Sequence, residues 1–224
     1  MKKNIVIAID GVSGSGKSTL ARALAKRLGF SYLDTGAMYR ALTYQALQKK
    51  ADFSDPLALY ARVKNARFRL SPSGKRVWLD GREISRPIRG VRVSQHVSLL
   101  ASVPKIRSWM VQLQRAMAKS DSVVMEGRDI GTVVFPQADI KFFITASLEE
   151  RARRRLQEMR MLDSRARYTT ILKNLADRDA LDSGREASPL RQAPDAHLID
   201  STRMTAPEKT ACALAIIRKK MAGI

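Results

Sequence analysis

A glycine-rich segment directly after the first apolar run constrains this chain more than any other feature. Residues 5–9 are all apolar, and residues 11–19 read Gly-Val-Ser-Gly-Ser-Gly-Lys-Ser-Thr, which fits the pattern G-x-x-x-x-G-K-[ST]. Glycines in this pattern adopt backbone angles closed to other residues, so main-chain N–H groups can crowd around phosphate oxygens. Residues 19–29 carry leucines at four-residue spacing and end on Gly, which predicts a helix. The sequence therefore predicts a phosphate-binding loop between a strand and the positive end of a helix.

The loop predicts binding of a nucleoside triphosphate. Lys17 supplies a mobile positive charge for the β- and γ-phosphates, and the Ser18 hydroxyl is the expected Mg²⁺ ligand. The predicted nucleotide-binding residues are Gly11, Val12, Ser13, Gly14, Ser15, Gly16, Lys17, Ser18 and Thr19.

Short apolar runs alternate with helical patterns along the rest of the chain. The runs lie at residues 5–9, 32–34, 122–126, 140–144 and 197–200, and helical patterns include residues 148–161, 171–180 and 207–221. This alternation predicts an α/β fold, a parallel sheet of the P-loop NTPase type covered by helices on both faces. Ligands of such sheets bind at the carboxyl ends of the strands.

One stretch breaks that alternation. Residues 68–70 and 76–79 alternate apolar and polar side chains around a turn, which predicts a hairpin that continues toward residues 83–84. Between Arg62 and Arg92 there are ten basic residues and only two acidic ones. We interpret the hairpin as a small antiparallel insert and the charge as a solvated face.

The overall charge leaves a second class of function open. The chain has 41 Lys and Arg against 21 Asp and Glu, a formal charge of +20, which would attract nucleic acid or any polyphosphate. A nucleic-acid-binding NTPase is therefore the alternative from another class, but no nucleic-acid-binding motif or aromatic stacking surface accompanies the charge.

A length of 224 residues, of which 45% are hydrophobic, predicts one domain over residues 1–224. No run of 18 apolar residues occurs, and residues 1–3 carry no cleavable signal pattern, so a soluble cytoplasmic protein without membrane contact is expected. The single cysteine, Cys212, excludes an intramolecular disulfide and a cysteine metal cluster, and it lies in an apolar helical stretch where core packing is expected.

Three further segments set arginine beside aspartate or at the start of a helix. They are residues 34–40, 125–131 and 178–190. Each alone is typical of a surface ion pair. Behind a phosphate-binding loop, the three together indicate a clamp on two phosphate-bearing ligands.

With these segments the chain resembles, nearly end to end, the bacterial cytidylate kinases of the nucleoside monophosphate kinase group. The resemblance rests on residues 11–19, 33–40, 126–136, 178–190 and 198–202, and the block 127–136 is the most specific. It implies transfer of the γ-phosphoryl group of ATP to CMP or dCMP in pyrimidine metabolism, by a monomer with no specific nucleic-acid partner. It also implies a monophosphate-binding insert at about residues 62–100 and a short helical lid at about residues 154–185.

The resemblance assigns roles residue by residue. The CMP phosphate would be held by Thr35, Arg40, Arg128 and Arg185, the ribose and neighbouring charge by Arg178 and Asp182, and the base by Ser98, Arg107 and Asp129. A carboxylate can accept from the cytosine amino group, and uracil lacks that donor. The catalytic residues would be Lys17, Arg128, Arg154, Arg155 and Arg185, with Arg151 and Arg155 one turn apart on the helix that leads into the lid.

The chain departs from the family pattern at three positions. Val12 stands where Pro is frequent, Thr35 where Ser is frequent and keeps the hydroxyl, and Glu126 where Asp is frequent. Whether the longer Glu126 reaches water bound to Mg²⁺ stays open here. The nearest alternative is a kinase of the same fold with another acceptor, such as UMP, dTMP or a small alcohol.

Overall fold

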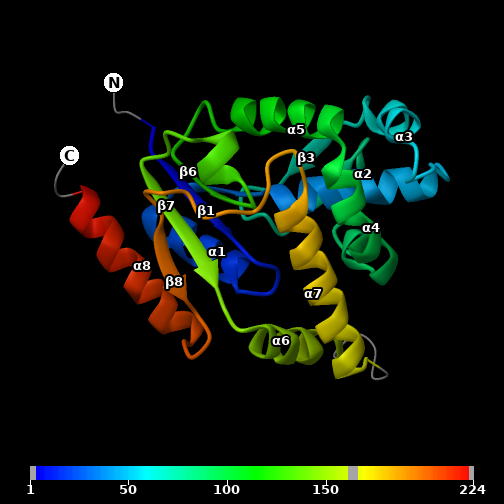
Figure 1. Cartoon of the computed structure of the whole chain (residues 1–224). Coiled ribbons are helices and arrows are strands. Elements are labelled where there is room, and N and C mark those ends of the chain that lie inside the picture. The colour runs from blue at the N-terminus through cyan, green and yellow to red at the C-terminus, as the bar shows by residue number, and fades with distance from the viewer. Residues whose placement is uncertain (1–3, 161–165, 222–224) are drawn as a thin grey trace.

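A five-stranded parallel sheet forms the centre of the molecule (Figure 1). The computed structural model describes residues 4–160 and 166–221. The strands, in spatial order, are β2 (Ser31–Asp34), β6 (Val123–Glu126), β1 (Val6–Gly11), β7 (Ile140–Thr145) and β8 (His197–Asp200). All five predicted strands are confirmed, with ends that shift by two residues at most. Because every pair is parallel, all the carboxyl ends lie at one edge of the sheet.

Helices cover both faces of this sheet, as predicted, because the central strand buries both of its faces. Side chains alternate along a strand, so Ile7 and Ile9 enter one core and Ala8 the other. The first core is closed by α1 (Lys17–Leu28) and α8 (Ala206–Met221). The second is closed by α2 (Thr35–Gln48) and α5 (Pro104–Met117). Cys212 is free and half-buried beside the first core, in agreement with its expected packing role.

Short polar residues define where these helices begin and end. Asp34 starts α2, its Oδ1 accepting from the N–H of Ala37 at 2.9 Å. Thr205 and Glu208 form a reciprocal cap at the start of α8, so Pro207 occupies the second helical position. Gly29 ends α1 in a left-handed conformation, with its N–H on the carbonyl of Ala25.

The predicted insert is a three-stranded antiparallel sheet flanked by helices. The helices and strands of this region, which begins before the predicted insert, are α3 (Pro56–Val63), β3 (Phe68–Leu70), β4 (Val77–Leu79), β5 (Arg82–Glu83), η1 (Pro87–Arg89) and α4 (Val91–Ser102). The expected hairpin pairs β3 with β4. A second hairpin, β4 with β5, turns at Asp80 and Gly81, whose φ angles of 48° and 82° are typical of a type I′ turn.

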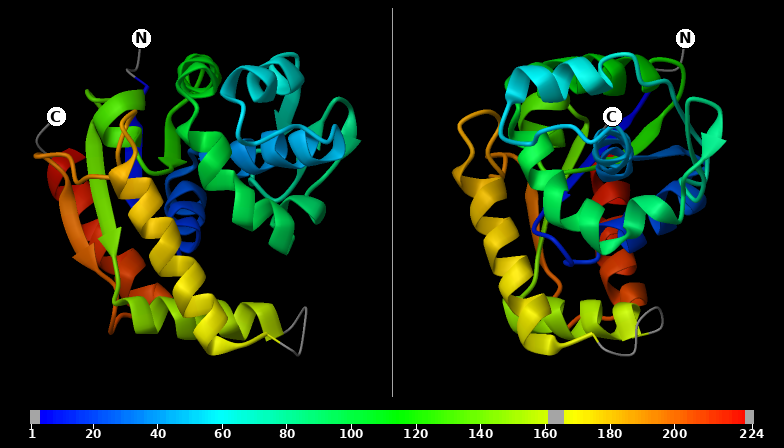
Figure 2. Two further views of the ribbon diagram at one scale, coloured as in Figure 1. Left: turned by 45° about the vertical axis from the view of Figure 1, so that its right-hand side comes forward. Right: turned by 90° about the vertical axis from the view of Figure 1, so that its right-hand side faces the viewer.

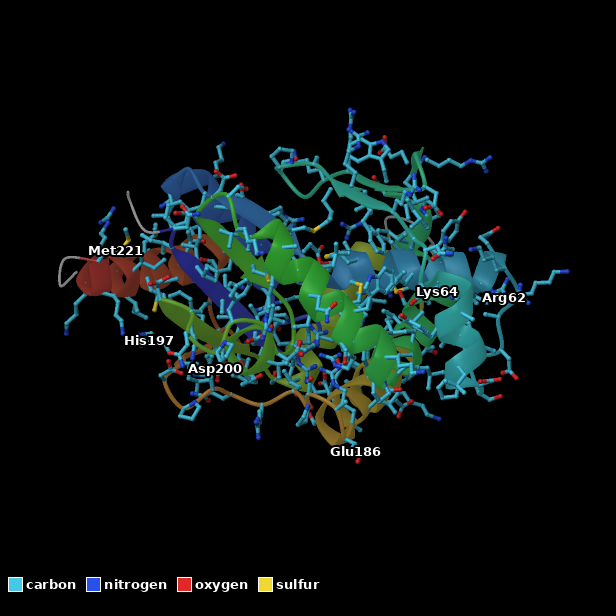
Figure 3. All side chains as sticks on the ribbon, turned by 90° about the horizontal axis from the view of Figure 1, so that it is seen from above. Arg62, Lys64, Glu186, His197, Asp200 and Met221 are labelled. Atoms are coloured by element: carbon cyan, nitrogen blue, oxygen red, sulfur yellow. The ribbon has the colours of Figure 1, made fainter. Side chains whose placement is uncertain are left out.

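The basic side chains of the insert all face solvent, as interpreted from the sequence. They are Arg62, Lys64, Arg67, Arg69, Lys75, Arg76, Arg82, Arg86, Arg89 and Arg92. Arg62 and Lys64 lie at the end of the molecule opposite Met221 (Figure 3). The guanidinium of Arg69 covers the ring of Trp78 at 3.8 Å from its centroid, a cation–π contact on the outer face of the small sheet.

Two helices form an arm at the carboxyl edge of the main sheet: the first lies below that edge, and the second rises from it alongside the sheet (Figure 2). They are α6 (Leu148–Arg160) and α7 (Tyr168–Gly184), which pack through Ala152, Ile171 and Leu175. The helix expected over residues 148–161 is thus confirmed to Arg160, and Met161 lies outside the described residues, as do residues 1–3. Within the described ranges, no helix is both long and apolar enough to span a membrane.

The first hairpin turn of the insert rests on the main sheet through a glycine. Gly74 has a φ of 65°, and a Cβ atom there would lie 2.1 Å from Cε1 of Tyr32 on β2. Gly74→Ala is expected to lower the free energy of unfolding by about 1–2 kcal/mol through backbone strain and by about 1–3 kcal/mol more through the clash. Chemical denaturation measures the sum.

Gly81→Ala is the matched control, since Gly81 has a similar φ of 82° and open space around it. For Gly81→Ala, the free energy of unfolding is expected to fall only by the backbone-strain contribution of about 1–2 kcal/mol. Equal losses for the two variants would contradict the proposed docking of the turn on Tyr32.

Candidate active site

The phosphate-binding loop connects β1 to α1 with three positive-φ glycines, Gly11, Gly14 and Gly16. Gly11 is needed because a Cβ atom there would lie 2.0 Å from the carbonyl oxygen of Ile144 on the neighbouring strand. Gly16 turns the chain into α1 with a φ of 81°. The predicted conformation is therefore confirmed, and the first helical turn has no acidic residue to compete with an anion.

Lys17 lies inside the loop and is almost completely buried, with 5% of its surface exposed. Its Nζ donates to the carbonyl of Val12 at 2.6 Å. Burial, with the nearby Arg128, holds the pKa of Lys17 well below its usual range. A polyphosphate in the loop would restore the charged form, because an opposite charge at this distance favours ammonium.

A hydroxyl and a carboxylate meet beside the loop. Ser18 Oγ donates to Glu126 Oε2 at 2.9 Å, and the Tyr32 hydroxyl donates to Glu126 Oε1. Burial and then Asp34 raise the pKa of Glu126 to about 7. Hydroxyl and carboxylate oxygens suit Mg²⁺, which keeps most of its waters and uses few protein ligands. The longer Glu126 thus reaches the P-loop serine directly. Among residues 4–160 and 166–221, no cluster of three or more His, Cys, Asp or Glu side chains offers another metal site.

Three guanidinium groups converge on one carboxylate. Asp182 Oδ2 accepts from Arg128 Nε at 2.8 Å, and Arg178 Nε and Arg185 Nη1 lie 3.9 Å and 3.8 Å from its two oxygens. We call Arg128, Arg178, Arg185 and Asp182 the arginine cluster. It carries two positive charges in excess.

The arginine cluster is short of acceptors. Arg178 Nε and Arg185 Nη2 are buried and have no hydrogen-bond partner among the residues that the structure describes. Burial and then Arg128 lower the pKa of Arg178 to about 10. Unpaired buried donors are costly, so the cluster fits an anion with several oxygens, such as a phosphate.

Two other residues expected to hold this phosphate lie near the cluster. Burial, followed by Arg178 and Arg155, lowers the pKa of Arg40 to about 9, while Arg40 Nη1 donates to Ser94 Oγ at 2.9 Å. The Thr35 hydroxyl donates at 2.7 Å to the main-chain carbonyl of Glu126, the residue whose side chain accepts from Ser18.

The residues expected to read the base form a buried ion pair and one detached hydroxyl. Arg107 and Asp129 are joined through Nη2 and Oδ2, and their side chains are 5% and 7% exposed. Arg107 Nη1 also donates to the carbonyl of Ala101, while Nε is buried and has no partner within residues 4–160 and 166–221. Ser98 instead donates to Asp182 at 3.4 Å, so it contacts the arginine cluster rather than the Arg107–Asp129 pair.

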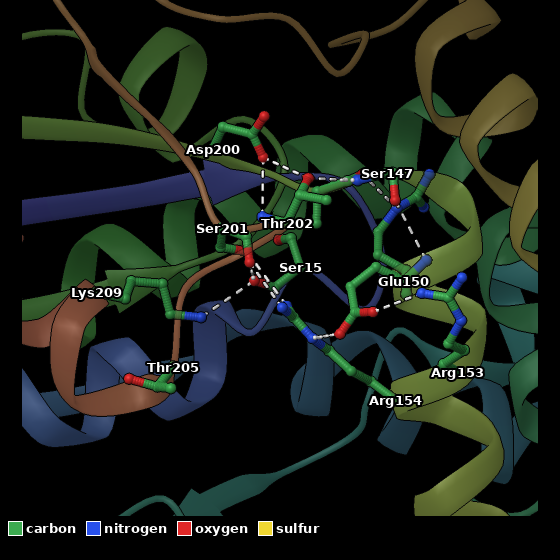
Figure 4. Close-up of polar contacts among 12 residues, drawn as sticks. Ser15, Ser147, Glu150, Arg153, Arg154, Asp200, Ser201, Thr202, Thr205 and Lys209 are labelled. Carbon is green, nitrogen blue, oxygen red and sulfur yellow. Dashed lines mark hydrogen bonds and ion pairs between the residues drawn. The ribbon is translucent and has the colours of Figure 1, made fainter.

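The arginines of α6 have protein partners. Arg154 donates to Glu150 Oε1 at 3.0 Å and to the carbonyl of Ser201 at 2.6 Å, as Figure 4 shows. Arg155 pairs with Glu158 at 2.9 Å. Arg151, one helical turn before Arg155, is buried against the loop, whereas Arg155 is half exposed.

Several residues of the site were not predicted. Asp10 is buried and accepts from the N–H groups of Ile130 and Gly131 at 2.8 and 2.7 Å, which ties the Arg128–Asp129 segment to β1. Burial raises the pKa of Asp10 to about 6. The sequence signal for this residue was its position, because Asp10 directly follows the apolar run at residues 5–9. Arg151 and Asp179 hold the two main-chain groups of Ser13, but they lie 28 positions apart and no local pattern joins them.

Known proteins resemble the chain over almost its whole length. The family model described as cytidylate kinase matches residues 7–219. The cytidylate kinase of Caldanaerobacter subterraneus subsp. tengcongensis is 46% identical, over 98% of this chain and 97% of that protein. The cytidylate kinase of Exiguobacterium sp. is 48% identical, over 92% of each.

A solved structure supports the fold. The uncharacterized protein from Eubacterium ventriosum ATCC 27560 superimposes with a TM-score of 0.54 at 15% identity, over 97% of this chain and 99% of that one. At this identity the likeness concerns the arrangement of strands and helices.

Proposed function

The chain belongs to the cytidylate kinase family, and from this membership we propose that it transfers the γ-phosphoryl group of ATP to CMP or dCMP, giving ADP and CDP or dCDP. The observation that supports the proposal is that cationic side chains gather in two separate places, each of which suits an anion. One is the loop around Lys17, and the other is the arginine cluster with its unpaired buried donors.

The reaction needs no general base. A nucleotide phosphate is already anionic at neutral pH, so the protein has to hold two anions that repel each other in line and to neutralise charge on the transferring group. We assign that work to Lys17, Arg128 and Arg185. Arg154 and Arg155 belong to the same proposal, but they would have to leave Glu150, Ser201 and Glu158 to reach the γ-phosphate.

The acceptor side divides into a phosphate part and a base part. Thr35, Arg40, Arg128 and Arg185 hold the CMP phosphate in this proposal, and Arg178 and Asp182 lie against the ribose. Asp129 accepts from the cytosine amino group while Arg107 donates to the O2 and N3 acceptors. Ser98 joins them through Asp182 rather than through the pair.

Magnesium is proposed as the metal of the reaction. Ser18 would ligate it and Glu126 would hold one of its waters, because both oxygens lie beside the loop and bond to each other at 2.9 Å. When bound, Mg²⁺ neutralises charge on the β- and γ-phosphates.

The remaining expectations stay proposals: a single kinase domain that acts as a monomer in the cytoplasm, with an insert at about residues 62–100 and a lid at about residues 154–185. The lid residues 161–165 lie outside the described part of the chain. Closure of both parts would exclude water from the transferring group.

The test is ADP formation with Mg·ATP against CMP, dCMP, UMP, AMP and dTMP, beside a control without acceptor. Rapid turnover with CMP and dCMP is expected. Preference for another monophosphate would change the acceptor and retain the fold. Hydrolysis of ATP without acceptor, stimulated by nucleic acid, would overturn the proposal in favour of the NTPase that the +20 charge left open.

A further inference from the structure

One carbonyl of the phosphate loop is held from outside the loop by two side chains (Figure 4). The carbonyl oxygen of Ser15 accepts from Ser201 Oγ at 2.9 Å and from Lys209 Nζ at 3.2 Å. Ser201 follows the end of β8, and Lys209 lies in the first turn of α8. Ser15 and Ser201 have no exposed surface, and Lys209 has 3%.

These two bonds determine which way the next main-chain donor points. A trans peptide is planar, and its C=O and N–H groups point in opposite directions. Because the Ser15 carbonyl is turned outward to β8 and α8, the N–H of Gly16 is turned inward, toward the space that phosphate oxygens occupy. Gly16 is the residue before the first turn of α1 and has a left-handed φ of 81°. The Ser15–Gly16 peptide therefore lies outside the helix, whose hydrogen bonds do not fix its orientation.

Lys209 is close to the loop and lacks a compensating carboxylate. A Cβ atom on Gly16 would lie 2.3 Å from Lys209 Nζ, so the ammonium rests directly on the Cα atom of that glycine. Within residues 4–160 and 166–221, Lys209 forms no ion pair, and the charged group that faces it is the cation Arg154 of α6. Burial and then Arg154 lower the pKa of Lys209 to about 8. An ammonium in this position destabilises the ligand-free protein, whereas an anion in the loop would stabilise it.

We propose that Lys209 and Ser201 are positioning residues for ATP: they fix the Ser15–Gly16 peptide so that the Gly16 N–H faces the phosphates, and Lys209 adds positive charge behind the loop. This inference rests on the proposed function, since it assigns a further part of the ATP site. It differs from the role of Lys17, which lies on the inner side of the loop.

The variant Lys209→Met removes the donor and the charge but keeps the length of the side chain. The Kd for ATP, measured by calorimetry without acceptor, and the KM for ATP are both expected to rise about tenfold, the effect of one charge-assisted hydrogen bond. The KM for CMP is expected to stay within twofold. Ser201→Ala should raise the same two ATP constants, by a smaller factor because its bond is between neutral groups.

Stability gives a second readout that separates positioning from packing. The pKa of Lys209 is lower in the folded protein than in the unfolded chain, so its burial costs free energy below pH 8, and this cost is relieved as the pH rises from about 8 toward 10.5. Lys209→Met without nucleotide should therefore unfold at the same or a higher temperature than the wild type at pH 7, and the excess should shrink above pH 8.

Thr210→Val is the matched control, since it removes a buried hydroxyl one residue further along α8. Among the described residues, this hydroxyl bonds within the helix, to the carbonyl of Ala206. The ATP constants of Thr210→Val should equal those of the wild type. An unchanged Kd for ATP in Lys209→Met overturns the inference. A lower unfolding temperature of this variant, together with equal rises in the KM for ATP and the KM for CMP, also overturns it, because that result indicates a packing role. Wild-type protein that binds ATP but does not phosphorylate CMP would instead overturn the proposed function, and the ATP affinities of the variants would still decide the inference.

Discussion

Replacing Lys17 by methionine is expected to lower kcat by about 10²–10³-fold, the usual effect of removing one preorganised charge or donor from a transferring group. The KM values for ATP and CMP should change much less. Lys17 is buried in the loop, and its Nζ is held by the carbonyl of Val12, so the charge is already in place before the γ-phosphoryl group moves. Stabilisation that is stronger in the transition state than in the ground state appears in kcat.

The measurement is steady-state kinetics with Mg·ATP and CMP, with Lys26→Met as the control. Lys26 lies on the same helix with its side chain exposed, so its loss should leave kcat unchanged. Since burial lowers the pKa of Lys17, the methionine variant should be at least as stable as the wild type, and thermal unfolding checks that the fold is intact. A Lys17→Met protein with kcat within threefold of the wild type would remove Lys17 from the mechanism.

The second large effect is expected at Asp129, where asparagine should reduce the preference for CMP over UMP by about 10–100-fold, the discrimination typical of a paired hydrogen-bonding contact to a base. A carboxylate only accepts, which suits the cytosine amino group. An amide can also donate, which suits the O4 atom of uracil. Asparagine is preferred to alanine because both variants remove the charge that pairs with Arg107, but only the amide oxygen of asparagine still accepts a hydrogen bond from the buried guanidinium. Loss of both charge and acceptor in the alanine variant would cost about 3–5 kcal/mol.

The experiment compares kcat/KM for CMP and UMP in the wild type, Asp129→Asn and the control Asp52→Asn. Asp52 is exposed and accepts hydrogen bonds from Ser54, so its substitution should leave the ratio unchanged. A fall in kcat/KM for CMP together with a rise for UMP would support the assignment. If Asp129→Asn discriminated as sharply as the wild type, the base would have to be read elsewhere.

The phosphate loop is braced by four elements that lie far from it in the sequence. Arg151 of α6 and Asp179 of α7 hold the carbonyl and the N–H of Ser13, at 3.1 and 3.3 Å. Ser201 after β8 and Lys209 of α8 hold the carbonyl of Ser15. Since α6 and α7 include most of the proposed lid, any movement of these helices changes the bonds at Ser13. The proposed closure of the lid is therefore expected to depend on whether the loop is occupied.

The amino-acid sequence alone determined the features that depend on neighbouring residues. The order of strands and helices followed from apolar periodicity, and the loop at residues 11–19 followed from glycines whose backbone angles are local. The first hairpin of the insert was predicted for the same reason. The second, at Asp80 and Gly81, was also marked by a local turn signal, although its strand is only two residues long.

Only the tertiary structure decided which charged groups are partners. Arg128 and Asp129 are adjacent and were interpreted together, yet Arg128 pairs with Asp182 and Asp129 pairs with Arg107. Successive side chains beyond a strand point in different directions, so adjacency in the chain separates them in space. The contacts of Arg151 with Asp179 and of Lys209 with Ser15 join residues 28 and 194 positions apart. Such contacts depend on how the helices pack against the sheet, and that packing is set by burial of apolar faces, which carries no information on charge partners.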